Sequence, residues 1–557
     1  MKVERPLWRV AVVVGVALAV ALPLSLVIYQ SFLSAPFFQP TAKGSFDAYT
    51  FVFSDKDFWT ALRNTVFVAT GMTAIAVPLG GILAFLMIRT DLPGRSWIEP
   101  LLLSPVFVSP MVLAFGYVVA LGPVGFVSLA AKSIFGDVPW TIYSLPAIAV
   151  VAGLTHIPHV YLYASSALSS LGSDVEEAAR VAGAGPLTVM RRVSLPMIAP
   201  ALLFAGVLVF FLGFEMFALP LILGDPEGIL VLTSYLYKLT NRFGVPSYQL
   251  MAVVVVAILA ISLPLVLLQR RLLRDAERYV TLKGKGARSK PLPLGKSRWI
   301  AFAGVVLWLL VAVGIPLAGI GLRSVVSAWG EGINITEVLT LDHFYEVFDY
   351  PPLVHGIVNT ILIATIGGAA SVAVYALIAL SVHRWPHPLA RIVDYAVLIP
   401  RAMPGLIAGL AMLWVFLFFA PLRPLKSTLV SLWIAYTLVW LAYGMRLISA
   451  SLLQVGRELE EAGKVAGAST GRVNREITIP LIRFGLMSSW VLIFMIFVRE
   501  YSTGIYLLGP GTEVTGAQLI SLWGTGAADV VSALSVINVA TLAVGLAIAL
   551  RLGVRLR

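Results

Sequence analysis

Four ionisable side chains lie at membrane depth, away from the ends of apolar stretches that are long enough to cross a bilayer: Glu215, Arg401, Arg499 and Glu500. Because a charge inside hydrocarbon is costly, such residues are candidates for function. A hydrolytic site would need a nucleophile and a base facing a cavity, which Glu215 and His156 alone do not supply. The sequence leaves two interpretations open: contact with a solute on a translocation pathway, or pairing between helices, for example of Arg401 with Glu500.

His156 and His159 flank Pro158, where an interrupted helix could expose its backbone. Two histidines at positions i and i+3 without a third ligand are thin evidence for a metal site, so we expect no metal and a buried hydrogen-bonding role instead. The sequence contains no cysteine, which excludes disulfides, thiol catalysis and cysteine-based metal sites.

A polar segment occurs twice in this otherwise apolar chain. Residues 171–184, LGSDVEEAARVAGA, match residues 455–468, VGRELEEAGKVAGA, at 8 of 14 positions and at a spacing of 284 residues. Glutamates followed by small residues suit two turns of helix that a partner can approach closely, and Gly183 can end the first helix in a left-handed conformation. Upstream, Asn64 in NTVFVATG corresponds to Asn359 in NTILIATI, and Arg89 corresponds to Arg384, both at a spacing of 295. The chain is therefore an internal duplication.

Composition places this duplication in a membrane. Of 557 residues, 59% are hydrophobic and 12% are charged, whereas a soluble domain has about 25% charged residues. A spanning helix needs about 20 apolar residues, and twelve stretches qualify. They lie at roughly 8–29, 62–88, 98–121, 141–165, 197–223, 249–269, 299–322, 357–383, 392–418, 427–450, 481–508 and 531–550. The first is too long for a signal peptide, and we expect it to be retained. We expect an all-α membrane protein of about twelve transmembrane helices in two parallel six-helix repeats.

Basic residues set the expected orientation. Between Arg270 and Arg298, ten basic residues outnumber two acidic ones, so the positive-inside rule puts this connection in the cytoplasm. The acidic connection from Arg323 to His355 suits the outer side, and both termini are then cytoplasmic. We expect a first repeat at 1–269, a flexible basic linker at 270–298 and a second repeat at 299–557. The duplicated polar segments fall in cytoplasmic loops at about 171–196 and 455–480.

The net charge of +12 does not indicate nucleic-acid binding, because no aromatic platform or groove-reading helix accompanies the basic linker. The fragment GKS at Gly295 does not indicate a phosphate-binding loop either. That motif needs a glycine five residues before Gly295, where the sequence has Lys290.

The duplicated loops resemble the cytoplasmic loop of the permease subunits of binding-protein-dependent ABC importers, which reads E-A-A, three residues, G, nine residues, I-x-L-P. The first copy has Glu177-Ala178-Ala179, Gly183 and Val193 to Pro196, and the second has Glu461-Ala462-Gly463, Gly467 and Ile477 to Pro480. Val193, Gly463 and Ile479 differ from the family pattern in size only. In that family the loop is the coupling helix, which sits in a cleft of an ATPase subunit. The resemblance thus implies a set of residues for coupling to an ATPase: Glu176, Glu177, Ala178, Ala179, Gly183, Pro196, Glu460, Glu461, Ala462, Gly467 and Pro480.

The resemblance extends over nearly the full length to the fused two-repeat permeases for ferric iron and to their relatives for polyamines, thiamine and phosphonates. FEMFALPLILGDPEGILVLTSYLY from Phe214 and REYSTGIYLLGPGTEV from Arg499 carry it. It implies the type I ABC importer permease fold and uptake of ferric iron or a related small charged solute. A phosphonate, an organophosphate, a polyamine or thiamine is the alternative. Glu215 and Glu500 suit a cation, whereas Arg401 and Arg499 suit an anion, so the residues leave the substrate open.

The same resemblance implies the partners and the location. Two copies of a cytoplasmic ATPase subunit would hold ATP and Mg²⁺ and hydrolyse the nucleotide, a periplasmic or extracellular substrate-binding protein would dock from outside, and this chain would catalyse nothing and bind no cofactor. Its place would be the bacterial inner membrane, within lipid. The rival interpretation is a proton-coupled secondary transporter, which can also consist of two parallel six-helix bundles. Such a transporter needs no polar helix repeated at the same loop.

Overall fold

The structure is a computed structural model that describes residues 7–172, 174–241, 246–279, 291–397, 399–400 and 403–551. Within these ranges the chain is helical, and its only β-type pairings are three isolated bridges. The described part contains eight helices long and apolar enough to cross a membrane, or up to eleven if each of three bent helix pairs is one span. Each of the twelve expected stretches contains a helix or a broken pair of helices, which confirms the all-α membrane fold.

The compact units of the fold do not coincide with the halves of the sequence. One unit combines the described residues up to Thr50 with Ser247–Val256 and with the chain from His343 onwards, and the other combines Phe51–Pro246 with Ala257–Asp342. The first helix of each half therefore belongs to the unit formed mainly by the other half. The compact units therefore differ in composition from the repeats expected at 1–269 and 299–557.

The exchanged helices make specific contacts in their new units. Helix α1 (Leu7–Ser31) packs on α19 (Gly368–Val382), α20 (Pro388–Ala396) and α21 (Gly405–Phe418). In the other unit, α15 (Ser297–Leu309) donates a hydrogen bond from Trp308 Nε1 to Leu154 O, and α16 (Ile315–Arg323) packs on α5 (Pro110–Leu121). Gly116 of α5 permits this approach, since a Cβ there would collide with Pro316 O.

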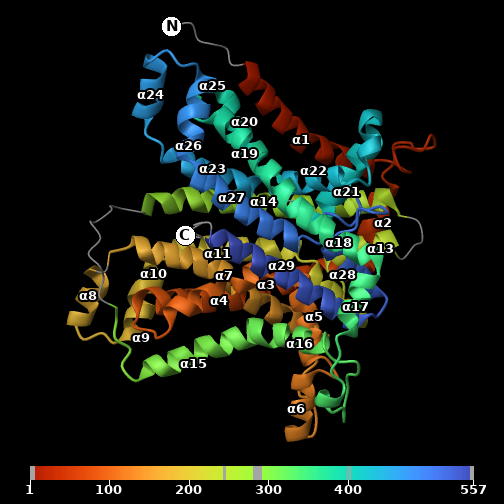
Figure 1. Ribbon diagram of the computed structural model, residues 1–557, viewed down its shortest axis with the longest axis vertical. Coiled ribbons are helices and arrows are strands. Elements are labelled where there is room, and N and C mark those ends of the chain that lie inside the picture. The colour runs from red at the N-terminus through yellow and green to blue at the C-terminus, as the bar shows by residue number, and fades with distance from the viewer. Residues whose placement is uncertain are drawn as a thin grey trace. The chain divides into compact units, whose positions relative to one another are not determined.

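In the unit that contains α15, helices α3 (Lys56–Arg89), α7 (Leu145–Ser170) and α11 (Ala199–Glu215) pack side by side (Figure 1). A Cβ on Gly80 would stand 2.6 Å from Val160 Cβ, and one on Gly153 would stand 2.7 Å from Ile75 Cβ. Small residues at such crossings let membrane helices approach closely. The packing brings Arg89, the last residue of α3, to the C-terminal end of α7.

In the unit that contains α1, helices α19, α23 (Leu441–Leu453) and α27 (Arg483–Arg499) pack on one another, and α29 (Ala528–Arg551) packs on α27. Gly444 faces the ring of Tyr375 more closely than a Cβ would allow. Tyr375 is fully buried, and its hydroxyl donates to Thr437 O over 2.7 Å. This packing brings the end of α19 to the end of α23.

The remaining longer helices include further membrane-spanning segments and shorter connecting helices. They are α2 (Asp47–Ser54), α4 (Arg95–Phe107), α6 (Phe126–Phe135), α12 (Ala218–Leu223), α13 (Leu232–Asn241), α14 (Tyr248–Tyr279), α17 (Asp342–Asp349), α18 (Pro351–Leu362), α22 (Leu429–Val439) and α28 (Thr515–Gly524).

The expected flexible linker begins as a helix. Helix α14 continues to Tyr279, so the first ten residues of the expected linker, 270–279, are helical. Residues 280–290 lie outside the described part of the chain. The described chain resumes at Pro291, and Leu292 forms a parallel bridge with Thr90 just beyond the end of α3.

Candidate functional site

The two duplicated polar segments fold in the same way. Loop A (residues 174–197) consists of α8 (Asp174–Val181), α9 (Pro186–Val189), a π-helical turn (Met190–Ser194) and α10 (Leu195–Met197). Loop B (residues 457–481) consists of α24 (Arg457–Val465), α25 (Thr470–Val473), a π-helical turn (Asn474–Thr478) and α26 (Ile479–Leu481). Figure 1 labels both sets of short helices. After the first helix, every boundary is repeated at the spacing of 284 residues, so the duplication extends to local backbone geometry.

A left-handed glycine ends the first helix of each loop. Gly183 has φ 85° and Gly467 has φ 86°. Beyond Gly183, Ala184 N donates to Ala179 O over 2.9 Å, and beyond Gly467, Ala468 N donates to Gly463 O over 3.0 Å. These bonds form the motif that satisfies the last carbonyls of a helix and reverses the chain. The left-handed helix end expected at Gly183 is confirmed, and Gly467 repeats it.

The proline at the end of the family-like pattern in each loop lies next to a bend. Pro196 is the second residue of α10 and Pro480 the second residue of α26. Two residues later, at Ile198 and Ile482, the helix axis bends by 72° in loop A and by 70° in loop B before the long helix begins. Proline suits this place because its missing N–H is not required in the first turn of a helix. The loops therefore lead directly into α11 and α27.

The first helix of each loop, α8 in loop A and α24 in loop B, presents an apolar surface to its surroundings. Val181 in loop A is 91% exposed, and its counterpart in loop B, Val465, is 89% exposed. Val175 and Leu459, which also correspond, are about half exposed. Ala178 and Ala462, which lie between these residues, and Ala182 and Ala466, which directly follow the valines, are exposed as well. Exposed apolar surface repeated on two equivalent helices is typical of a protein contact.

The two adjacent glutamates of each loop point in different directions. Glu177 and Glu461 are exposed, as the expected coupling role requires, whereas Glu176 is 4% exposed and Glu460 is 5% exposed. Glu176 and Glu460 were expected to belong to the contact surface. The structure instead places both inside the protein.

Glu176 is held by residues from both ends of loop A and by the end of α3. Arg89 Nε lies 3.2 Å from Glu176 Oε2, and Ser194 Oγ donates to Glu176 Oε1 over 2.6 Å. The same guanidinium donates through its NH2 nitrogen to Leu168 O (2.9 Å) and Leu171 O (3.0 Å) at the end of α7. We call Arg89, Glu176 and Ser194 lock A.

Loop B has the equivalent arrangement, which we call lock B. Arg384 donates to Glu460 Oε2 and to Val455 O, just beyond α23. Thr478 Oγ1 donates to Glu460 Oε1 over 3.1 Å, as Ser194 does in lock A. Lock B also includes His383, whose Nε2 lies 3.2 Å from Glu460 Oε1. Burial lowers the pKa of His383, and the neighbouring carboxylate of Glu460 only partly offsets this effect.

The residues of the locks are repeated in the sequence. Arg89 and Arg384 correspond, Glu176 and Glu460 correspond, and a hydroxyl residue stands at 194 and at 478. The arginine, the glutamate and the hydroxyl residue thus recur with their chemistry in both halves, whereas His383 occurs only in lock B, and the two halves differ at most other positions. Nothing in the sequence indicated that these positions, far apart along the chain, meet at one point.

Glu500 organises the backbone that follows α27. Its Oε1 accepts hydrogen bonds from the amides and hydroxyls of Ser502 and Thr503, at 2.9 to 3.1 Å, and its Oε2 accepts one from Trp440 Nε1 at 3.1 Å. The expected partner Arg401 lies outside the described residues. Glu500 is therefore a buried acceptor that shapes a turn.

The other intramembrane candidates end their helices. Glu215 is the last residue of α11 and Arg499 is the last residue of α27, and both are half-buried. His156 Nδ1 lies 2.8 Å from Ala152 O, and its ring stacks on that of His159 at 5.1 Å. Among the described residues, no three His, Cys, Asp or Glu side chains gather as a metal site would require.

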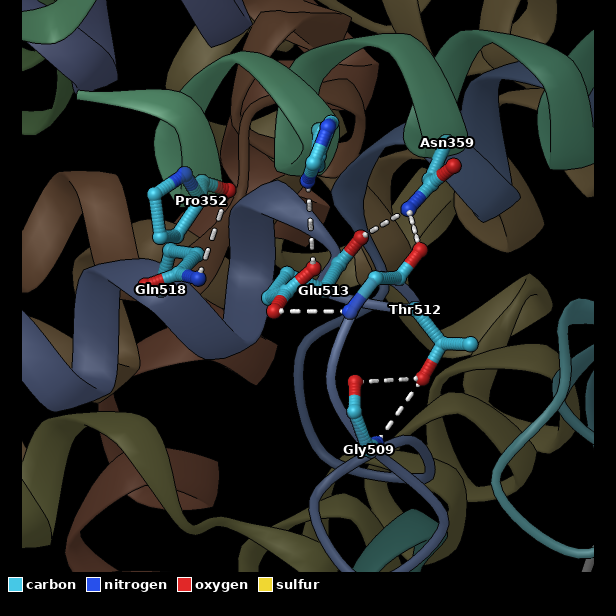
Figure 2. A network of polar contacts seen from close by, with 8 residues as sticks. Pro352, Asn359, Gly509, Thr512, Glu513 and Gln518 are labelled. Carbon is cyan, nitrogen blue, oxygen red and sulfur yellow. Dashed lines mark hydrogen bonds and ion pairs between the residues drawn. The ribbon is translucent and has the colours of Figure 1, made fainter.

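Asn64 and Asn359, which correspond in the two halves, form hydrogen bonds with the segments that follow α11 and α27. Figure 2 shows Asn359 Nδ2 donating to Gly511 O (3.0 Å) and Glu513 O (2.9 Å). In the other unit, Asn64 Nδ2 donates to Leu230 O over 2.9 Å. The next residue also repeats its role: Thr360 Oγ1 accepts from Thr515 N, and Thr65 Oγ1 accepts from Leu232 N, both at 2.9 Å. Each half thus holds one of its loops by the same Asn-Thr pair.

A family profile covers both halves, including both locks. The profile described as "Binding-protein-dependent transport system inner membrane component" matches residues 76–278 and 375–556. The chain belongs to this family. The matched segments contain loops A and B entirely, so the duplicated site lies within the part of the chain that defines the family.

Curated relatives match most of the chain. It is 25% identical over 474 residues to the ferric transport system permease protein FbpB of Actinobacillus pleuropneumoniae, covering 83% of this chain and 66% of that protein. It is 24% identical over 465 residues to the putative ferric transport system permease protein FbpB 1 of Haemophilus influenzae, covering 81% of this chain and 71% of that protein. The chain thus spans slightly less than two thirds of the length of the first relative.

One further relative and one solved structure extend the comparison. The probable ABC transporter permease protein y4fN of Sinorhizobium fredii is 25% identical over 468 residues, covering 81% of this chain and 79% of that protein. A bacterial ABC transporter involved in the import of the acidic polysaccharide alginate matches with a TM-score of 0.37 and 17% identity, over 46% of this chain and 94% of that chain.

Proposed function

We propose that this chain is the fused permease of an ABC importer and that loops A and B are the surfaces on which two cytoplasmic ATPase subunits act. The observation that carries this proposal is the pair of almost fully exposed valines, Val181 and Val465, at equivalent places on two short helices. A solvated loop would have polar residues there, whereas a docking helix needs apolar ones. ATP and Mg²⁺ then belong to the partner subunits.

The orientation follows from this proposal. Loops A and B face the cytoplasm, and so do both termini and the basic connection between the halves, as the positive-inside rule favours. A substrate-binding protein delivers the solute to the opposite side of the inner membrane. The left-handed glycines and the elbows at Ile198 and Ile482 join each docking helix to a long apolar helix, which gives ATPase movement a direct route into the membrane.

We propose ferric iron or a related small charged solute as the substrate, because the first two relatives are named as ferric transport permeases. A phosphonate, an organophosphate, a polyamine or thiamine remains the alternative, since the intramembrane residues include both acids and arginines. Uptake of radiolabelled ferric iron into vesicles that contain the whole transporter, with unlabelled spermidine, thiamine or phosphonate as competitor, tests the choice. No uptake of ferric iron by vesicles that do take up one of these other solutes in labelled form would contradict the iron assignment.

The docking surface is tested by placing a carboxylate on it. Val181→Asp combined with Val465→Asp should weaken co-purification of the ATPase subunit by about tenfold or more, because an unpaired carboxylate at a buried contact is costly. Ile134→Asp is the matched control, since Ile134 is also largely exposed, at 74%, but lies on α6 and belongs to neither loop. Undiminished ATPase binding by the folded double variant would refute the assignment of the loops.

A further inference from the structure

The locks contain charges that are buried behind the docking surface. Glu176 and Glu460 are nearly inaccessible, while their neighbours Glu177 and Glu461 are exposed. A residue in this position cannot contact an ATPase docked on the outer face of the helix. Glu176 and Glu460 also cannot line a solute pathway between the membrane helices, since they lie on α8 and α24, beyond the ends of those helices. Neither the docking contact nor a solute pathway therefore explains why a carboxylate is present twice at this place.

A buried ion pair is poorly explained by stability alone. Removing two charges from water is expensive, and well-packed apolar residues of similar size are often equally stable or more so. What an ion pair with several hydrogen bonds does provide is fixed geometry. In lock A the fixed parts are the end of α3, the end of α7, the first turn of α8 and the π-helical turn, since Arg89, Leu168, Glu176 and Ser194 come from these four elements.

The charges also suit the helix ends that they join. The Arg89 guanidinium donates to the last carbonyls of α7, and Glu176 lies in the first turn of α8. Cations are favourable at helix C-termini and anions at helix N-termini. Arg384 repeats this arrangement by donating to Val455 O after α23, while Glu460 lies near the start of α24. Both locks thus tie the end of one long helix to the start of a docking helix.

Each lock also forms hydrogen bonds with residues at or just before the start of α15 or α1, the helices exchanged between the units. Leu292 N donates to Arg89 O (2.8 Å), Asp91 N donates to Leu292 O (3.1 Å), and Leu294 N donates to Asp91 Oδ1 (2.8 Å), only three residues before α15 begins. In the other unit, Arg9 at the start of α1 donates to His383 O at 3.5 Å. A lock therefore joins the loop of one half to the first helix of the other.

We propose that Arg89–Glu176–Ser194 and Arg384–Glu460–Thr478 are positioning elements that make each docking helix move as one body with the long helices behind it. This inference rests on the proposed function, because it assumes that an ATPase moves loops A and B. Without the locks, the ATPase still binds to the exposed faces and hydrolyses ATP, but its movement is taken up by the loop and does not reach the membrane helices.

The test separates binding from transmission. Glu176→Gln combined with Glu460→Gln keeps the shape of both side chains and removes the charge. In vesicles containing the whole transporter, we expect ATPase co-purification and basal ATP hydrolysis to stay near wild-type, while solute taken up per ATP hydrolysed falls about tenfold, within the usual range of allosteric coupling. Arg89→Gln combined with Arg384→Gln should give the same loss, and all four changes together should give no further loss, because the residues act as one unit.

The neighbouring glutamates supply the matched control. Glu177→Gln with Glu461→Gln makes the same chemical change one residue away, and it should weaken ATPase binding without lowering the transport per ATP of the complexes that remain. If Glu176→Gln with Glu460→Gln abolishes ATPase binding in folded protein, or leaves transport per ATP unchanged, the lock proposal is wrong. Failure of the wild-type chain to bind any ATPase would instead refute the proposed function.

A second variant keeps the test decisive if the glutamine variants do not fold. Ser194→Ala with Thr478→Val removes only one hydroxyl donor from each lock and leaves both ion pairs in place. We expect a smaller loss of transport per ATP of the same kind, with ATPase binding retained. Unchanged transport per ATP in this variant would overturn the proposal that the hydroxyl residues belong to the positioning unit.

Discussion

Gly463 and Ile477 pack against each other in loop B so closely that a Cβ on Gly463 would stand 2.8 Å from Ile477 Cδ1. The equivalent positions in loop A are Ala179 and Val193. Loop B combines a smaller residue, glycine, with a larger one, isoleucine, where loop A has alanine and valine, so the combined side-chain size of the two positions is nearly the same in both loops. The departure from the family pattern at Gly463 therefore leaves room for the larger Ile477 in loop B.

This packing predicts that Gly463→Ala destabilises loop B by about 1–3 kcal/mol, the usual cost of overpacking. Adding Ile477→Val, which reproduces the pair of loop A, should restore most of the loss. Limited proteolysis of loop B, calibrated by thermal unfolding, measures both variants. If Gly463→Ala alone is as resistant as wild-type, the two positions are not coupled.

The left-handed glycines predict a second effect. Gly183→Ala should cost about 1–2 kcal/mol, because an L-residue at φ 85° is strained although no atom lies within 4 Å of the new methyl group. Gly185→Ala is the control, since Gly185 also has nothing within 4 Å but has an ordinary φ of −75°. Equal thermal stability of the two variants would mean that the turn after α8 relaxes without cost.

His383 makes the stability of loop B depend on pH. The unperturbed pKa is 6.5, and burial lowers it in the folded protein. The unfolded chain therefore takes up a proton first, so the stabilisation is complete above the unfolded pKa and is lost as pH falls through the lowered pKa of His383. The groups that act on this ring are Glu460, Arg384 and Arg9.

Loop A provides the comparison for this effect, because Ile88 stands at the position that corresponds to His383. Hydrogen exchange should show loop B becoming less protected than loop A between about pH 7 and pH 5, the range in which histidine titrates. His383→Ile should remove the difference. A wild-type loop B as protected at the lower pH as at the higher would argue against a role for this histidine.

The hydrogen bonds of Asn359 predict that its alanine and aspartate variants differ in thermal stability. Asn359→Ala leaves the carbonyls of Gly511 and Glu513 without their donor, at a cost of about 1–3 kcal/mol. Asn359→Asp should be worse than alanine, because a carboxylate would face two carbonyl oxygens. Thermal unfolding distinguishes these cases, and an aspartate variant as stable as wild-type would contradict the geometry in Figure 2.

The features that were predictable from sequence are those that a single segment determines. Apolar stretches predicted the spans because crossing hydrocarbon requires length and hydrophobicity from each helix by itself. The repeated glycine predicted the turn after α8, since the left-handed conformation that favours glycine is a local property of the backbone. The loop ends expected at Pro196 and Pro480 lie just before α11 and α27, because the effect of proline on the start of a helix is also a local property of the backbone.

The features that were missed depend on partners. Hydrophobicity says that α1 and α15 lie in the membrane but not which helices they contact, so their exchange between units was not foreseen. Two adjacent glutamates read alike in sequence, yet Glu176 faces Arg89 while Glu177 faces outward, because consecutive residues on a helix point in directions about 100° apart. The helical continuation of α14 was missed because its charged residues resemble those of a linker.

The most direct test of the central claim is uptake by vesicles of defined composition. The chain reconstituted with its ATPase subunit and substrate-binding protein should accumulate radiolabelled solute only when ATP is present, and Val181→Asp with Val465→Asp should abolish the uptake. Accumulation by the chain alone, driven by a proton gradient without nucleotide, would show that loops A and B do not carry the driving force and would contradict the account.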